Sequence, residues 1–389
     1  MKIKLLKAKS ISDTRGDKTI EVQLKTEYGV FIASAPNGKS RGKYEAEPWK
    51  KSSNEDVKFV NAIKISEVKF DKFDDLALIE KIFRNKVGAN TMIAIECAFL
   101  KALAKENKTE VWKLINPRAK NFPMPVGNAI GGGVHSPGKK PDFQEFHLIP
   151  NTDFEKAVKI NKRGWENCSE LLKNLDKNFT GKTNDENAWI TEFDDNQVME
   201  IIQDVKENMI EEFSTKIHCG IDVAASGLYK NNKYNYLNPK KSLSRSEQIK
   251  FMTEIADKFF YLEDPLEEND FSGFAELMKK AKGQGLIVGD DLTVTNLQRI
   301  DKAWKMRAIN GVIIKPNQNG SLIEVKKIVE YCKSKGIKTI FSHRSGETSE
   351  NILADLAFGF QADFIKTGIT GKGRDEKLNR MIEIEKSLF

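Results

Sequence analysis

The first part of the chain carries a hydrophobic pattern with a period of two. Residues 19–25 alternate strictly between apolar and polar side chains, and the apolar run V-F-I-A-S follows the turn-forming pair Tyr28-Gly29. A period of two places alternate side chains on one face of a strand, and a glycine between two such runs is typical of a hairpin. This segment therefore predicts a β-hairpin with one buried face.

The period changes to that of a helix from Asn54 onward. Apolar residues recur three or four positions apart in residues 57–63 and 76–83, and a longer stretch runs from Ala89 to about Lys105. A sheet followed by a run of helices indicates an α+β domain. Pro117, Pro123 and Pro125 would interrupt any further helix. We therefore expect an α+β N-terminal domain over residues 1–122.

The C-terminal half repeats a different unit. Six short apolar runs recur at the spacing of a strand, a loop and a helix, and each ends in charged or polar side chains. The runs end at Asp222, at Glu263 and Asp264, at Asp290 and Asp291, at Lys315, at His343 and Arg344, and at Lys366. Strand ends of a βα barrel converge on one face, where such barrels place their active sites. The pattern predicts an α/β barrel enzyme over residues 123–389.

Composition narrows the class of protein. The chain has 389 residues and is 39% hydrophobic, enough for a barrel and a second domain. It has no apolar run of the ~18 residues that a membrane span needs, and its N-terminal apolar stretch is too short for a secretory signal. We expect a cytoplasmic protein that does not bind membranes.

Charge and cysteine content add two expectations. The net charge is +7, but the lysines are scattered, which argues against nucleic-acid binding and favours a site for an anionic substrate. The four cysteines, which include no C-x-x-C pair, are interpreted as buried reduced thiols.

Three strand-end carboxylates, Asp222, Glu263 and Asp290, come from successive units. Converging carboxylates repel one another unless a divalent cation lies between them, and hard oxygen ligands suit Mg²⁺. The alternative is that a strand-end carboxylate merely caps the next helix, which is common for any one of them. Three in consecutive units favour a metal site.

The next three strands end in cations. Lys315, Arg344 and Lys366 could clamp an anion opposite the metal, and arginine suits phosphate or carboxylate. We expect a neighbouring cation and a metal to lower the pKa of Lys315, which would make it a base near neutral pH. The alternative, a strand-end lysine reaching solvent, explains poorly why both lysines follow strongly apolar runs.

At these residues the sequence resembles the enolase family from about Lys9 to Phe389. The matching motifs are S-H-R-S-G-E-T (342–348), L-E-D-P-L (262–266), V-G-D-D-L (288–292), I-K-P-N-Q (314–318), I-K-T-G (365–368), T-R-G-D-K-T-I-E-V (14–22), A-P-N-G-K-S-R-G (35–42), G-A-N (88–90) and Q-E-F (144–146). Any one motif is weak evidence, but the set in this order is specific. The resemblance implies an enolase-type modified TIM (β/α)8 barrel whose first units depart from plain βα repetition.

The resemblance also implies the reversible, Mg²⁺-dependent dehydration of 2-phosphoglycerate to phosphoenolpyruvate. In that reading Asp222, Glu263 and Asp290 would hold one magnesium ion, and Ser40 would help bind a second when the N-terminal loop closes over the substrate. The implied catalytic residues are Lys315 as base, Glu186 as general acid and Glu145 in support, with His135, Gln144, His343, Arg344, Ser345 and Lys366 binding the small phosphorylated acid. A lysine base assisted by magnesium is the established pattern of this superfamily. A homodimer or larger assembly is also implied.

The sequence departs from the family pattern in several loops. The departures are Asn184, Asn187 and Ala188, which replace glycines around Glu186, then Asn37, Lys39 and Arg41 around Ser40, and finally Gly131 for an asparagine, Gly227 for a glutamate and Asn319 for an apolar residue. Asparagine adopts glycine's backbone angles less readily, and alanine does so poorly. Because these changes avoid the metal ligands and Lys315, they bear on the substrate more than on proton abstraction.

Three hypotheses stay open. The first is an active enolase, the second an enolase-like lyase or isomerase that acts on another carboxylic acid with Lys315 still the base. The third is a non-catalytic binding or scaffold protein, although such a protein has no physical need for so many buried carboxylates and lysines.

Overall fold

The computed structural model describes residues 1–39, 42–282 and 285–388. Its N-terminal part opens with an antiparallel sheet of β1 (Ile3–Ser12), β2 (Lys18–Thr26) and β3 (Gly29–Ser34), in that order. The apolar residues of β2 are fully buried beneath helix α3 (Ala89–Glu106). The predicted hairpin and its buried face are confirmed.

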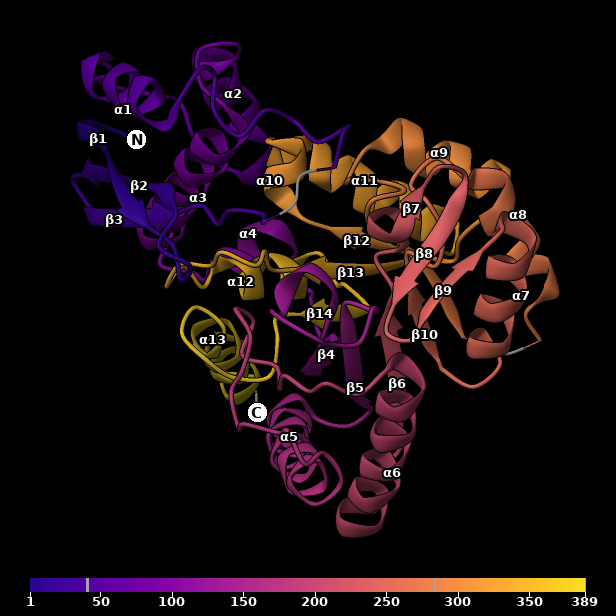
Figure 1. The fold of residues 1–389 in the computed structure, drawn as a ribbon. Coiled ribbons are helices and arrows are strands. Elements are labelled where there is room, and N and C mark those ends of the chain that lie inside the picture. The colour runs from indigo at the N-terminus through magenta and orange to yellow at the C-terminus, as the bar shows by residue number, and fades with distance from the viewer. Residues whose placement is uncertain (40–41, 283–284, 389) are drawn as a thin grey trace.

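Helices complete this part of the molecule, shown in indigo and violet in Figure 1. They are α1 (Ser53–Ala62), the 3-10 helix η1 (Phe73–Asp75), α2 (Leu76–Phe83) and α4 (Val111–Ile115), together with α3. The hydroxyl of Ser52 accepts a hydrogen bond from the backbone N–H of Glu55 and so caps α1. The sheet followed by helices is the α+β arrangement that the sequence predicts.

The C-terminal part contains a closed eight-stranded barrel in the order β10-β11-β12-β13-β14-β4-β5-β6. Its strands are β4 (Met124–Gly131), β5 (Glu145–Pro150), β6 (Ile217–Asp222), β10 (Tyr261–Glu263), β11 (Leu286–Gly289), β12 (Gly311–Ile314), β13 (Lys338–Ser342) and β14 (Phe364–Lys366). Each of the six predicted strand ends coincides with the last residue of one of these strands or directly follows it. The barrel is confirmed.

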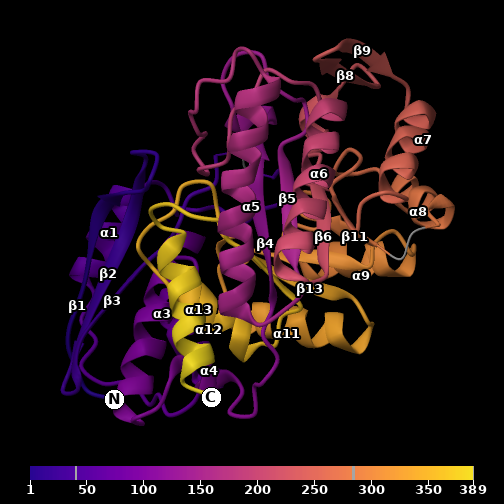
Figure 2. The same cartoon turned by 90° about the horizontal axis from the view of Figure 1, so that it is seen from below.

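One strand runs against the others. β5 pairs antiparallel with both β4 and β6, whereas the remaining neighbours are parallel. Two long helices, α5 (Phe154–Leu175) and α6 (Asp195–Phe213), follow β5 and lie side by side before β6 begins (Figure 2). This is the departure from plain βα repetition that the resemblance implies.

Helices cover the outside of the barrel. After β6 come the 3-10 helix η3 (Ala225–Leu228) and a small sheet of β7 (Tyr229–Lys230), β8 (Lys233–Leu237) and β9 (Lys240–Leu243). The later helices are α7 (Arg245–Ala256), α8 (Phe271–Lys280), α9 (Leu297–Lys305), α10 (Pro316–Asn319), α11 (Leu322–Ser334), α12 (Ile352–Gly359) and α13 (Asp375–Lys386), and the 3-10 helix η2 (Gly133–His135) follows β4.

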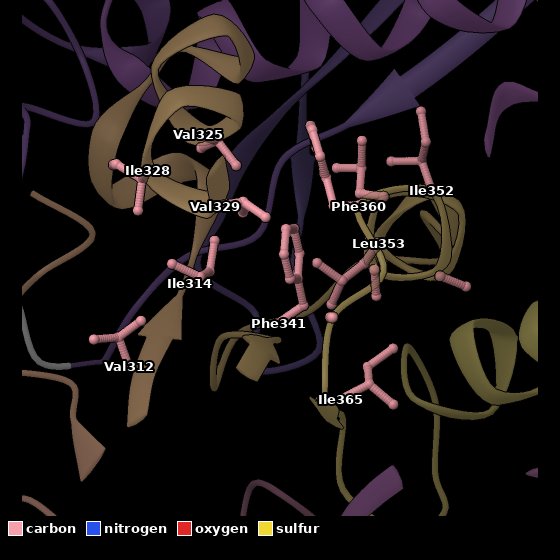
Figure 3. Close-up of a cluster of buried hydrophobic side chains, with 14 of the residues drawn as sticks. Val312, Ile314, Val325, Ile328, Val329, Phe341, Ile352, Leu353, Phe360 and Ile365 are labelled. Carbon is pink, nitrogen blue, oxygen red and sulfur yellow. The ribbon is translucent and has the colours of Figure 1, made fainter. Parts of the chain in front are cut away.

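Apolar side chains from strands and helices interdigitate between these two layers. In Figure 3, Ile314, Phe341 and Ile365 from β12, β13 and β14 meet side chains of α11 and α12. All of them are nearly or fully buried, and burying an apolar side chain of this size contributes about 1.5–3 kcal/mol. This packing fixes the strands whose carboxyl ends carry the polar residues.

None of the helices in the described part of the chain is long and apolar enough to cross a bilayer. The four cysteines are buried and unpaired, as the sequence predicts.

Candidate active site

A pocket opens at the carboxyl ends of the barrel strands and gathers most of the predicted site residues. Eleven of them line it, namely His135, Gln144, Glu145, Glu186, Asp222, Asp290, Lys315, His343, Arg344, Ser345 and Lys366. Glu263 is fully buried and does not line this pocket, although it contacts Lys366. Ser40, like Arg41, lies outside the described residues.

Lys366 sits among three carboxylates. It ends β14, and its Nζ donates to Asp222 Oδ2 at 3.0 Å and to Glu263 Oε2 at 2.9 Å, with Glu145 Oε1 3.3 Å away. Burial favours the neutral amine, but these three carboxylates outweigh it and raise the pKa of Lys366 well above its usual value. Lys366 is therefore a fixed positive charge.

Lys315 forms a partly buried ion pair with Asp290, which follows β11. Burial and the cations Arg344 and Lys366 lower the pKa of Lys315, but Asp290 outweighs them, so that the pKa is raised. The sequence predicts a lowered pKa from a neighbouring cation together with a metal. The cations alone do not lower it, because Asp290 is a direct carboxylate partner that the prediction missed.

The acidic residues of the pocket include one close cluster, and the three predicted metal ligands are shared between two lysines. Among the described residues, Asp264, Asp290 and Asp291 bring oxygen atoms within 4.8 Å of one another. Asp264 also accepts hydrogen bonds from the backbone N–H groups of Asp290 at 3.0 Å and Asp291 at 2.6 Å, which fixes the turn after β11. The predicted set of Asp222, Glu263 and Asp290 is divided, because Lys366 binds the first two and Lys315 binds the third.

The electrostatics of these carboxylates fit a divalent cation. Burial first, and then the charges of Asp222 and Asp290, raise the pKa of Glu263 well above its usual range. Burial and the charge of Asp291 do the same for Asp264. Beside burial, the neighbouring carboxylates thus disfavour one another's charged forms, and a set of oxygen ligands that repel one another suits Mg²⁺.

Glu186 points into the pocket from the loop between α5 and α6. It is only 3% exposed, its Oε2 accepts a hydrogen bond from Asn128 Nδ2 at 3.3 Å, and His135 Nε2 lies 3.9 Å from its Oε1. Asn128 is on β4, which is separated from β12 and Lys315 by two strands on one side of the barrel and four on the other. Glu186 and Lys315 therefore enter the pocket from well-separated sides.

The pKa values of the two glutamates move in opposite directions. Burial would raise the pKa of Glu186, but positive charge nearby, foremost that of His135, holds it below its usual value. Burial raises the pKa of Glu145 to about 7, and Glu186 adds to this effect while Lys366 opposes it. Glu145 is therefore the member of the pair whose protonation changes near neutral pH.

The residues that replace glycines around Glu186 adopt an ordered turn. Asn187 takes the left-handed backbone conformation with φ +63°, which asparagine tolerates better than most residues. Ala188 is fully buried and is not among the residues with positive φ. Of the three residues that replace glycines, only Asn187 is left-handed, and it is an asparagine.

The rim of the pocket around Arg344 and Ser345 carries hydrogen-bond donors for an anion. Arg344 pairs with Glu45 Oε2 at 3.0 Å, and Ser345 Oγ accepts hydrogen bonds from Arg15 Nη1 at 2.7 Å and from the backbone N–H of Lys39 at 2.8 Å. Burial lowers the pKa of His343 well below its usual value, so this ring is neutral. The N-terminal part of the chain thus contributes side chains to the rim.

The N-terminal part of the chain also contacts the side of the pocket that holds Glu186. Lys39 Nζ lies 2.9 Å from Asp185 Oδ2, and Asp185 Oδ1 lies 3.0 Å from His135 Nδ1. Gly38, Lys39 and Glu45 line the pocket with the barrel residues. Residues before and after the undescribed pair 40–41 therefore contribute to the pocket.

Comparison with known proteins agrees with this architecture. Residues 3–115 match the family model "Enolase, N-terminal domain", and residues 119–389 match "Enolase, C-terminal TIM barrel domain". The chain belongs to the enolase family. A protein named Enolase from Archaeoglobus fulgidus is 36% identical, covering 96% of this chain and 95% of its own length.

Other enolases are similarly related. The protein named Enolase from Pyrobaculum aerophilum is 36% identical over 95% of this chain and 93% of its own length. The one from Methanosphaera stadtmanae is 33% identical over 99% and 97%.

Several residues in or next to the pocket of this enolase-family chain were not predicted as site residues. Asp264 lies next to Glu263, Gln318 donates to Asp290 Oδ1 at 3.3 Å, and Arg15 and Glu45 reach the rim. Asp264, Gln318 and Arg15 lie inside motifs that carry the family resemblance, which was the available signal. Glu45 lies three residues beyond the nearest motif and had none.

Proposed function

We propose that this protein catalyses the reversible, Mg²⁺-dependent dehydration of 2-phospho-D-glycerate to phosphoenolpyruvate. The observation that carries the proposal is the presence, in one pocket, of Lys315 and Glu186 on well-separated sides with cationic donors at the rim. An elimination that removes a proton from one face of the substrate and a hydroxyl group from the other needs a base and an acid so separated. Membership of the enolase family supports the same reaction.

Lys315 acts on carbon 2. Its neutral amine takes the proton from that carbon, and the electron pair left behind moves into the substrate carboxylate. The pair returns to form the double bond between carbons 2 and 3 when the bond from carbon 3 to its hydroxyl group breaks. Lys366, held positive by its carboxylates, faces the charge that builds on the substrate carboxylate. Asp222, Glu263 and Asp290 would hold Mg²⁺, which supplies further neutralisation of that charge, and Ser40 would bind a second ion.

Lys315 must lose its proton before it can act as a base. Its pKa is raised by Asp290, which is also one of the carboxylates assigned to the cation. If Asp290 were shared with a bound Mg²⁺ ion, its ion pair with Lys315 would weaken. The positive charges of Arg344 and Lys366 would then favour the neutral amine of Lys315.

Glu186 acts on carbon 3. The carbon–oxygen bond breaks, and the hydroxyl group leaves as water with a proton from Glu186. An anionic substrate beside Glu186 would raise the pKa of this carboxyl group, since like charges favour the protonated form. Glu145, with its pKa of about 7, is the neighbouring group that can hold a proton for it. Arg344 and Ser345 take the phosphate, and His135, Gln144 and His343 line the pocket around the substrate.

The direct test is an activity measurement. Purified protein is mixed with Mg²⁺ and 2-phosphoglycerate, and the ultraviolet absorbance of the enol product is followed. We expect product formation that stops when the metal is chelated. A folded protein that forms no product with Mg²⁺ present would reject the proposal.

A second candidate is an enolase-like reaction on another carboxylic acid. It is favoured by Gly227, which lines the pocket where enolases usually have a glutamate, and by Lys39 at the same pocket. A Cβ atom added at Gly227 would meet nothing within 4 Å, so this side of the pocket has room. Deuterium uptake at carbon 2 of other phosphorylated or hydroxylated acids, lost in Lys315→Ala, would distinguish this candidate.

We further propose that residues 1–122 and 123–389 form separate capping and catalytic domains, and that the protein works in the cytoplasm as a homodimer or larger assembly. Family membership supports both statements. Light scattering on the purified protein tests the assembly, and limited proteolysis near residue 122 tests the domain boundary.

A further inference from the structure

The loop that carries Glu186, defined here as residues 183–189, is organised by one asparagine. Asn184 Oδ1 accepts hydrogen bonds from the backbone N–H groups of Glu186 at 2.9 Å and Ala188 at 3.0 Å. Its backbone N–H donates to Ala188 O at 2.9 Å, and its carbonyl accepts from Asn187 N–H at 3.1 Å. These four bonds close residues 184–188 into a turn around Glu186.

The turn docks on the end of β4 at Gly131. The backbone N–H of Gly131 donates to Trp189 O at 3.0 Å, and a Cβ atom added at Gly131 would lie 2.2 Å from Asn184 Nδ2 and 3.3 Å from Ala188 Cβ. Asn184 Nδ2 therefore fills the space that any side chain at position 131 would need. Gly131 also pairs with Glu145 across the β4–β5 register, so this contact lies beside the second glutamate.

We infer that Gly131 and Asn184 form a matched pair that positions Glu186. Enolases usually have an asparagine at position 131 and glycines around the acidic residue, and this chain has the two residue types exchanged. The amide that fills the space comes from the loop, and the glycine lies on the strand. Asn184 is a positioning residue, because it acts on Glu186 through the backbone N–H of that residue. The inference rests on the proposed role of Glu186.

A double-mutant cycle tests the pair. Gly131→Ala, Asn184→Gly and the combined variant are compared with the wild-type protein by kcat, KM and hydrogen–deuterium exchange of the amides of residues 184–188 without substrate. Asn187→Gly, the same type of change in the same loop at a residue with positive φ, is the matched control.

We expect each single change to lower kcat at least tenfold with less than a threefold change in KM, and to speed amide exchange in the loop. The combined variant should recover at least tenfold over the additive expectation, because removal of the Asn184 side chain makes room for the methyl group added at position 131. Asn187→Gly should stay within threefold of wild type. A second double variant, Gly131→Asn with Asn184→Gly, restores the usual family arrangement and should recover furthest.

Two results would overturn the inference. One is an Asn184→Gly protein with wild-type exchange and kcat, and the other is a combined variant no better than the additive expectation. If the wild-type protein lacks the proposed activity, the exchange measurements still decide whether the pair couples. Failure of the pair and failure of the proposed function are thus distinguishable.

Discussion

The two sides of the pocket are built in different ways. The side formed by Asp222, Lys315 and Lys366 stands on barrel strands, whose register sets where each side chain emerges. The side formed by Glu186 and Lys39 stands on loops, which are held by side-chain bonds between segments far apart in sequence. The departures around Glu186 and at Lys39 fall on the loop side, whereas Asp222, Lys315 and Lys366 are the residues that the family pattern predicts. The barrel fold itself thus keeps the side chains on the strands in place. Side chains on the loops depend instead on matched residues elsewhere, such as Gly131 for Asn184.

The strand side should give the largest effect. Lys315→Ala removes the proposed base and should lower kcat by about 10³-fold or more, near the upper part of the range for general acid–base groups. The rate of phosphoenolpyruvate formation at saturating substrate measures this. Lys305→Ala, at an exposed lysine that pairs with Asp301 on α9, is the control and should behave as wild type.

The loop side should give a smaller loss. Glu186→Gln keeps the size of the side chain and removes its acid function, and we expect kcat to fall by about 10²-fold. The exposed Glu166→Gln serves as the control. An effect of Glu186→Gln equal to that of Lys315→Ala would erase the contrast between the two sides.

A carboxyl group outside the reaction separates stability from activity. Burial raises the pKa of Asp195, at the start of α6, to about 8, although this group accepts a hydrogen bond from Phe143 N–H at 2.9 Å. The unfolded group titrates near pH 4. Its contribution to stability is therefore complete below about pH 4 and is lost as the pH rises through about 8.

Asp195→Asn keeps an acceptor for Phe143 without a charge. From pH 5 to pH 9, the Tm of wild type should fall by at least about 2 °C more than the Tm of the variant, while kcat at neutral pH stays within about twofold. Thermal unfolding followed by circular dichroism measures this. Parallel Tm curves for the two proteins would show that Asp195 does not titrate in this range.

The smallest effect belongs to the bridge between the N-terminal segment and the loop. The Lys39 side chain is 38% exposed, and exposed ion pairs contribute about 0–1 kcal/mol. Lys39→Ala should therefore raise KM by about fivefold at most and leave kcat unchanged. Added salt should reduce the difference in KM between the two proteins, because it screens the wild-type pair. An effect that does not depend on salt would argue against an ionic role for Lys39.

The sequence predicted the strand side because its evidence is local. An apolar run that ends in Asp222 or Lys366 predicts both a strand and the residue at its end. The closed barrel then brings these strand ends together. The raised pKa of Lys315 could not be predicted in this way, because it depends on the side-chain contact with Asp290. The ion pair between Glu45 and Arg344 could not be predicted either, because the two residues lie far apart in sequence. The fit between Asn184 and Gly131 depends on ångström-scale packing that no pattern of residues expresses.

The reversed direction of β5 has a consequence for how the chain supplies its reactive groups. In a regular barrel the loop after each strand lies at the end of the barrel where the pocket opens. Because β5 runs in the opposite direction, the loop after it lies at the other end, and the first residue of β5, Glu145, lies at the pocket. Helix α5, with 22 residues or about 33 Å, follows β5, and Glu186 lies in the segment between α5 and α6. A single inverted strand thereby places both Glu145 and the segment that carries Glu186 at the pocket.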